Sequence, residues 1–195
     1  MGKKLYSIPE IYKISFNAFR SAGRLKRGKK KEIIDDKLQE RIMLAVTAVN
    51  NCPMCSYAHT EMALKAGLSK EEIKVFTEGE FPDLPENEIK AVLFAQHYAD
   101  QRGNPSKEAW ENLIMEYNEA KAETVLAATR IIMFGNAVGI VFSSLKGRIK
   151  KTGADTRSNL LYEIIVLFSL LILIPMSILH AFFYNLINRP FIYFR

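Results

Sequence analysis

The sequence has little cysteine, and no stretch of it has the pattern of a secretory signal. Only two of its 195 residues are cysteine, and no apolar segment of a signal peptide follows Lys3 and Lys4. A chain without such a signal is expected in a reducing compartment, where structural disulfides are rare. A cysteine pair in this chain is therefore expected to be redox-active rather than structural.

The sequence also lacks the alternating apolar pattern of β-strands, internal repeats and low-complexity segments. Its apolar residues recur instead at helical spacing. We therefore predict an all-α fold, with a compact bundle of about seven helices over residues 1–145. Residues 146–159 are predicted to be a basic linker, residues 160–188 a membrane helix and residues 189–195 a short tail.

Both cysteines lie in one short motif. Cys52 and Cys55 have the spacing C-x-x-C, and His59 follows four residues after the second cysteine. Pro53 suits the first position of a helix. Cys52 would then be the N-cap of this helix, with Cys55 and His59 one turn apart on the same face.

A second predicted helix precedes this motif. It begins near Asp35 or Asp36, whose carboxylates suit a helix N-terminus, and its amphipathic part starts at Glu40. If it were unbroken, Glu40 would lie about 18 Å from Cys52, at a rise of 1.5 Å per residue. Asn50 and Asn51 can break the helix, so that the chain folds back and brings the Glu40 carboxylate toward the thiols and the imidazole. Such a site would contain a nucleophile, a resolving thiol and a base with an orienting carboxylate.

The spacing E-x11-C-x2-C-x3-H, from Glu40 to His59, resembles the cysteine-containing branch of the carboxymuconolactone decarboxylase and alkylhydroperoxidase-D-like family. The likeness extends weakly from Ile8 to about Leu145. Some members of the family carry a histidine just before the second cysteine, where this chain has Met54. A role of that histidine is therefore absent or replaced here.

The resemblance implies a thiol-dependent peroxidase. Cys55 would attack a hydroperoxide, Cys52 would resolve the sulfenic acid as a disulfide, and Glu40 and His59 would relay protons. A lipoyl-type dithiol or a small redox protein would regenerate the enzyme, with no cofactor. Family members usually form trimers or larger assemblies, so a homo-oligomer is expected. Lactone decarboxylation is not expected, because that branch does not depend on such a dithiol.

The motif has three other interpretations, of which two lack a required residue. A structural zinc site wants four ligands, and only Cys52, Cys55 and His59 cluster here, so no metal is expected. Haem attachment needs C-x-x-C-H, and Ser56 occupies the histidine position. A membrane-associated redox sensor or partner-binding protein that uses the dithiol as a switch stays an alternative, and turnover separates it from an enzyme.

The residues alone leave open which cysteine attacks. A helix N-terminus stabilises a thiolate, which favours Cys52. The resemblance favours Cys55, which lies one turn before His59. His97, in a predicted helix over residues 86–101, is more typical of a boundary histidine than of a catalytic one. Gly135 and Gly139 would allow another backbone or a ligand to approach closely.

Basic residues gather toward the two ends of the chain. From Arg20 to Lys31 there are seven basic residues and no acid, which is typical of a solvated loop but also suits anionic lipid headgroups. Nucleic acid is not expected as a partner, because the central part of the chain is acidic and no binding fold is evident. The helix predicted before this run, from Pro9, packs on the core or lies in a membrane interface.

The stretch from Ile164 to Ile187 has no formal charge over 24 residues. At 1.5 Å per residue it reaches about 36 Å, which is enough to cross a hydrocarbon core of about 30 Å with some tilt. We predict a single transmembrane helix, and the alternative is a tail helix buried against the domain or in an oligomer interface. Basic residues precede the span in larger number than they follow it, so the dithiol domain is predicted to be cytoplasmic.

Overall fold

A computed structural model describes residues 4–194. Over these residues the fold is all-α, as predicted, with eight helices and no strand. The helices are α1 (Ile8–Lys30), α2 (Asp36–Asn50), α3 (Pro53–Ala66), α4 (Lys70–Thr77), α5 (Glu86–Asp100), α6 (Lys107–Tyr117), α7 (Glu119–Lys150) and α8 (Leu160–Leu186).

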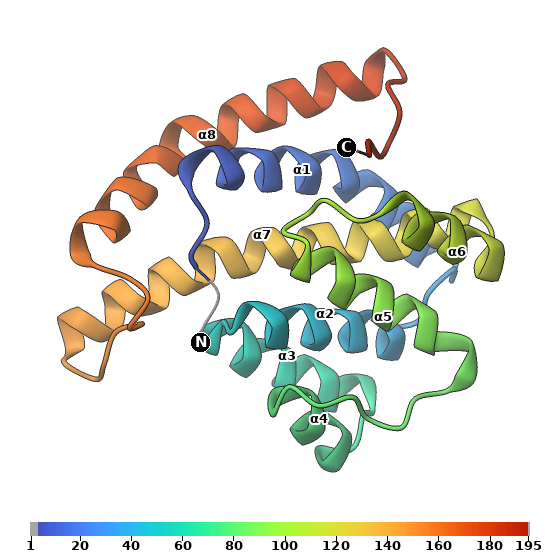
Figure 1. The fold of residues 1–195 in the computed structure, drawn as a ribbon, viewed down its shortest axis with the longest axis horizontal. Coiled ribbons are helices and arrows are strands. Elements are labelled where there is room, and N and C mark those ends of the chain that lie inside the picture. The colour runs from blue at the N-terminus through green and yellow to red at the C-terminus, as the bar shows by residue number, and fades with distance from the viewer. Residues whose placement is uncertain (1–3, 195) are drawn as a thin grey trace.

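The long helix α7 runs through the middle of the molecule (Figure 1). α1 and α8 lie on one side of it, whereas α2, α3 and α4 lie on the other. Small residues let the neighbouring helices approach α7, since Ala122, Ala127, Ala128 and Ala137 are all buried there. One continuous apolar core therefore connects the two sides of the bundle.

Local capping groups set several of the helix boundaries. Asp35 caps α2 by accepting a hydrogen bond from the Leu38 N–H, and Ser69 caps α4 by accepting one from the Glu72 N–H. Gly67 ends α3 in the left-handed conformation, at a φ of 89°. These side chains and turns satisfy backbone groups that a helix end leaves unpaired.

The basic run Arg20–Lys31 is not the loop that the sequence predicted. It is the second half of α1, which continues to Lys30. Here one face of the helix packs inward, with Ser21 and Gly28 buried, and Arg24 pairs with Glu123 of α7 at 3.0 Å. Packing against α7 thus stabilises the helical conformation of this run despite the repulsion between its basic side chains.

α7 also extends beyond its predicted end at Leu145. It continues to Lys150, inside the segment predicted as a linker. Arg148 and Lys150 lie in its last turn, where positive charge is favourable. The division into a bundle and a separate membrane segment stays a prediction.

α8 packs beside α1 and contacts α7. Glu163, in its first turn, is fully buried and lies 3.0 Å from Arg148 and 2.6 Å from the Ser144 hydroxyl of α7. Further along, the Tyr12 hydroxyl and His180 Nδ1 share a hydrogen bond of 2.9 Å between α1 and α8. α8 is thus fixed to the bundle at several points along its length.

Among the described residues, two helices are long and apolar enough to cross a membrane by length and composition. In α7 the apolar window is 72% buried inside the bundle, whereas in α8 it is only 22% buried. α7 is therefore accounted for as a core helix. α8 is the candidate for membrane contact.

Candidate active site

The turn between α2 and α3 places the two cysteines. Asn51 adopts the left-handed conformation at a φ of 53° and ends α2. Cys52 is the N-cap of α3, and Pro53 is the first residue of that helix, both as predicted. The Sγ atom of Cys52 accepts a hydrogen bond from the Cys55 N–H at 3.3 Å. A sulfur at this position is held where the helix N-terminus stabilises negative charge.

Cys52 and Cys55 are joined by a disulfide, with their Cα atoms 5.3 Å apart. The two residues differ slightly in exposure. Cys52 is fully buried, whereas Cys55 keeps 7% of its surface exposed. Of the pair, Cys55 is thus the residue that retains some contact with solvent.

Glu40 and His59 are brought together by the fold-back of α3 against α2. Nδ1 of His59 lies 2.8 Å from Oε2 of Glu40, and both side chains are largely buried. The carboxylate therefore fixes the orientation of the imidazole and leaves its Nε2 as the second site for a proton. His59 follows Cys55 by one helical turn, so the two side chains project from the same face of α3.

α7 lies directly against the disulfide, and Gly139 makes this close contact possible. A Cβ atom at Gly139 would lie 2.7 Å from the Cys55 sulfur and 3.0 Å from the Cys52 sulfur. The Cys55 sulfur also lies 3.7 Å from the backbone oxygen of Gly135. The sequence predicted that another backbone or a ligand would approach these glycines. At Gly139 the close neighbour is the disulfide instead, and a Cβ at Gly135 would meet only Ile132 of the same helix, at 3.7 Å.

Several polar residues next to this turn were missed by the sequence interpretation. Thr47 of α2 donates a hydrogen bond to Asn136 of α7 at 3.1 Å, and both side chains are buried. The Tyr6 hydroxyl donates to the side-chain oxygen of Asn50 at 2.7 Å, and burial raises the pKa of Tyr6 to about 12. Only the placement of Asn50 beside the motif could have indicated such a role.

Arg157, from the segment after α7, also holds the turn. Its guanidinium donates to the backbone oxygens of Asn50 at 3.1 Å and Asn51 at 2.9 Å. Asp155 in turn accepts from Arg157 at 2.6 Å. The residue just before Cys52 is therefore fixed from a segment more than a hundred positions away, and no local sequence signal predicts that contact.

His97 lies outside this cluster. Its Nε2 accepts a hydrogen bond from the Ser106 N–H at 3.1 Å, just before α6 begins. This contact holds the loop between α5 and α6. Within residues 4–194, no group of three or more His, Cys, Asp or Glu side chains is placed to hold a metal ion.

Comparison with known families agrees with the resemblance seen in the sequence. Residues 16–97 match the model of the carboxymuconolactone decarboxylase family. No curated protein and no solved structure matched the chain. The matched segment begins within α1, ends within α5 and contains Glu40, Cys52, Cys55 and His59. Over these residues the chain is therefore similar to the carboxymuconolactone decarboxylase family, as its sequence predicted.

Proposed function

We propose that the protein is a thiol-dependent peroxidase that reduces hydroperoxides through the Cys52/Cys55 pair. The family match and the cysteine pair support redox chemistry for this chain. The single observation that carries the finer proposal is the hydrogen bond between Glu40 and His59, one turn from Cys55. A carboxylate, an imidazole and two adjacent sulfurs are the groups that such a reaction needs.

In the first step, the Cys55 thiolate attacks one oxygen of the hydroperoxide. The S–O bond forms as the O–O bond breaks, and the leaving alkoxide takes a proton and departs as an alcohol. His59, oriented by Glu40, accepts the thiol proton beforehand and supplies one to the leaving oxygen. The product on the enzyme is a sulfenic acid, which is the reversible first level of cysteine oxidation.

In the second step, the Cys52 thiolate attacks the Cys55 sulfenic acid. The S–S bond forms, hydroxide leaves and is protonated to water, and the disulfide results. The burial of the two residues supports this order, because Cys52 is fully buried whereas Cys55 keeps 7% of its surface exposed. The capping hydrogen bond from the Cys55 N–H favours the thiolate form of Cys52 that this step requires.

A dithiol reductant then returns the enzyme to its starting state. Its thiolate attacks the sulfur of Cys55, the less buried residue of the pair, and releases Cys52 as a thiolate at the α3 N-terminus. Its second thiol completes the exchange, so two electrons pass from the reductant to the protein. Since the disulfide is nearly buried, a slender reductant of the lipoyl type fits better than a bulky one, and a small redox protein is the other candidate.

The alternative function is a redox sensor that uses the dithiol as a switch. One observation favours it. The disulfide contacts α7 at Gly139, so oxidation or reduction of the cysteine pair would change the packing of α7 against the other helices. The two functions differ in turnover. An enzyme consumes many equivalents of hydroperoxide when a dithiol reductant is supplied, whereas a sensor consumes one and stops.

The decisive experiment is therefore steady-state consumption of alkyl hydroperoxide by the full-length protein with dihydrolipoamide. We expect repeated turnover, lost in Cys55→Ser. Consumption that ends after one equivalent, in the presence of reductant, would favour the sensor.

We also propose that α8 attaches the protein to a membrane. The predicted single span, with the dithiol domain on the cytoplasmic side, stays a prediction. It requires α8 to separate from α1, because the two helices are linked at Tyr12 and His180 and the buried Glu163 lies at the start of α8. In the structure, α8 packs lengthwise along the bundle, so one long side of the helix, rather than its ends, is free to contact a membrane.

A further inference from the structure

The side of α8 that faces away from the bundle is apolar over its whole length. Val166, Leu170, Ser177 and Ala181 are buried on the inner side. The outer side carries a row of large apolar residues that are each more than half exposed: Leu161, Phe168, Leu171, Ile172, Leu179, Phe182, Phe183 and Leu186. We call this set the outer row. An uncovered apolar surface of this length indicates an apolar partner.

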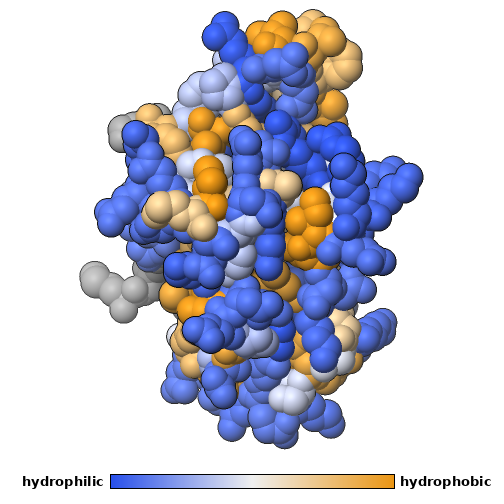
Figure 2. All heavy atoms as spheres, turned by 90° about the vertical axis from the view of Figure 1, so that its right-hand side faces the viewer, coloured by the Kyte–Doolittle hydropathy of each residue, from blue (hydrophilic) through white to orange (hydrophobic). Residues whose placement is uncertain are grey.

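A basic pocket lies at the C-terminal end of the outer row. Its volume is about 300 Å³, and it is lined by Arg20, Gly23, Arg24, Arg27, Asn185, Asn188 and Arg189. Arginines from α1 and from the turn after α8 thus meet there with two side-chain amides, and none of the described residues that line the pocket is acidic. Figure 2 looks onto this end of the molecule, with apolar residues at the top and a mostly hydrophilic face below.

Only some of the arginine side chains that line the pocket have hydrogen-bond or ion-pair partners among the described residues. Arg20 is almost fully buried and donates to the backbone oxygens of Arg189 and Pro190 at 2.8 and 2.9 Å, and so forms part of the wall. Arg24 pairs with Glu123. Arg27 and Arg189 have no acidic partner among residues 4–194, and the Arg27 guanidinium lies close to Gly23.

Two unneutralised guanidinium groups beside amide donors suit a phosphate group. A guanidinium can donate two parallel hydrogen bonds to phosphate oxygens, which makes arginine the preferred partner for such anions. Lipid headgroups carry this phosphate at the boundary of an apolar layer. The pocket and the outer row are adjacent, and this pairing of a phosphate-binding group with an apolar surface matches the edge of a bilayer.

We infer that the pocket binds the phosphate of an anionic lipid headgroup while the outer row lies in the apolar layer of the same membrane face. α8 then lies along the surface, as interfacial helices do. The chain after α8 supports this placement, because it returns to α1 (Figure 1) and the Phe191 oxygen accepts a hydrogen bond from Arg130 of α7 at 3.0 Å. The tail and the dithiol bundle therefore stay on the same side of the membrane.

A free phosphate or a second copy of the chain would each explain only one of the two features, the pocket or the outer row. A free phosphate would use the pocket and leave the outer row uncovered. A second copy of the chain would cover the row and bring a second set of arginines toward the first. An anionic bilayer satisfies both features at once. The inference does not rest on the peroxidase proposal.

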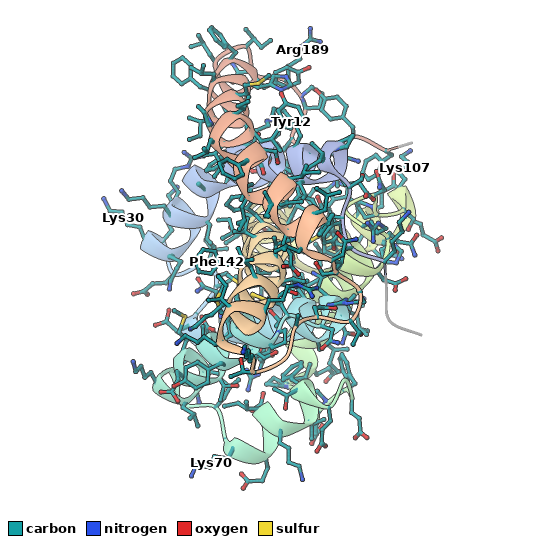
Figure 3. The ribbon with its side chains drawn as sticks, turned by 90° about the vertical axis from the view of Figure 1, so that its left-hand side faces the viewer. Tyr12, Lys30, Lys70, Lys107, Phe142 and Arg189 are labelled. Atoms are coloured by element: carbon teal, nitrogen blue, oxygen red, sulfur yellow. A yellow bond between two sulfur atoms is a disulfide. The ribbon has the colours of Figure 1, made fainter. Side chains whose placement is uncertain are left out.

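The test is binding of the full-length protein to vesicles of phosphatidylcholine with and without phosphatidylglycerol. We expect binding to the mixed vesicles that weakens with salt. Each basic residue at a membrane surface contributes about 1 kcal/mol, so the double variant Arg27→Gln/Arg189→Gln should bind about 30-fold more weakly. The matched control is Lys65→Gln/Lys70→Gln, which removes the same charge and should bind as the unaltered protein does. Figure 3 shows Arg189 and Lys70 at opposite ends of the molecule.

A variant of the outer row, Ile172→Ser/Leu179→Ser, should weaken binding to both kinds of vesicle, with helical content unchanged by circular dichroism. A tag on the C-terminus should be accessible from the side that carries the dithiol domain. A protected tag would indicate a span and overturn the surface arrangement.

Equal binding of the arginine variant and the lysine control would overturn the headgroup site, as would equal binding to vesicles without phosphatidylglycerol. Inorganic phosphate bound as tightly as the anionic vesicles, with no effect of the outer-row variant, would assign the pocket to a free phosphate. A stable dimer that binds no vesicles would assign the row to a second copy.

Discussion

At the scale of single residues, the chemistry depends on what each site residue contacts. Glu40 is 5% exposed and contacts His59, so its charge acts on the imidazole rather than on solvent. Cys52 and Cys55 share one helix N-terminus but differ in access. These differences assign the resolving role to Cys52 and the attacking role to Cys55 in the proposed mechanism.

Glu40→Gln should slow peroxide reduction without unfolding the protein. Glutamine has nearly the same shape but cannot hold the imidazole with a negative charge, and general acid–base assistance contributes about 10²–10⁴-fold. The measurement is the rate of peroxide consumption across pH. Glu61→Gln, an exposed carboxylate two residues after His59, is the control and should leave the rate unchanged. An unchanged rate in Glu40→Gln at every pH would remove Glu40 from the mechanism.

At the scale of helices, α7 determines how much room the disulfide has. Its Gly139 lies so close to both sulfurs that any Cβ must displace them. The same helix offers a matched position, since a Cβ at Gly135 would have only an ordinary contact of 3.7 Å with its own neighbour Ile132.

Gly139→Ala should therefore destabilise the oxidised protein, by about 1–3 kcal/mol for an overpacked core. Gly135→Ala should be neutral or slightly stabilising, because alanine favours a helix by up to about 1 kcal/mol over glycine. Urea unfolding of both variants in the oxidised state checks this. Equal stability of the two variants would show that α7 does not confine the disulfide.

A contact between two elements also joins the first turn of α1 to the residues just after α5. Arg102 donates to Glu10 at 2.7 and 3.0 Å, and the backbone N–H of Ser7 donates to the same carboxylate at 2.8 Å. The bonds from Arg102 and then Ser7 outweigh partial burial and lower the pKa of Glu10 from 4.5 to about 2.

A carboxyl group with a lowered pKa in the folded state stabilises that state above its unfolded pKa and loses this effect as the pH falls. Glu10→Gln should thus lower the free energy of unfolding at neutral pH, with the difference shrinking between about pH 4.5 and 2. Glu80→Gln, at an exposed loop position, is the control. A difference that stays constant down to pH 2 would contradict the role of the Arg102 contact.

At the scale of the whole molecule, the described residues leave apolar surface uncovered beyond the outer row of α8. Part of it lies on the outer side of α3, where Tyr57 is 74% and Met62 50% exposed. Because α3 carries the dithiol, a subunit packed on this side would also shield the site.

We therefore expect the full-length protein in detergent to form an assembly larger than a monomer, with α3 in the contact. Tyr57→Ser should weaken the assembly, whereas Met115→Ser, an equally exposed residue on α6, should not. Sedimentation velocity at micromolar concentration measures both. A monomer alone under these conditions would count against self-association.

The all-α fold could be predicted from the sequence because its signals are local. Helical spacing, the Asp35 and Ser69 caps and the Asn50-Asn51 break all act within a few residues. The N-cap position of Cys52 followed from the same signals. The approach of Glu40 to His59 followed from the break between their helices.

The remaining features depend on contacts between distant segments. The loop predicted over Arg20–Lys31 was wrong because α7 and the tail supply partners for α1 that no local pattern shows. The hydrogen bonds from Arg157 to the backbone oxygens of Asn50 and Asn51 also join distant segments, and no local pattern predicts them. The uncharged length of α8 predicted membrane contact, but the buried Glu163 and the returning tail appear only once the helices are packed.

The proposed chemistry is tested most directly by locating the first oxidation product. Cys52→Ser protein, treated with one equivalent of alkyl hydroperoxide and a sulfenic-acid trap, should carry the trapped adduct on Cys55 by mass spectrometry. Cys55→Ser treated in the same way should carry none. An adduct on Cys52 in Cys55→Ser protein that still reduces peroxide, or no adduct on Cys55 in Cys52→Ser, would contradict the mechanism.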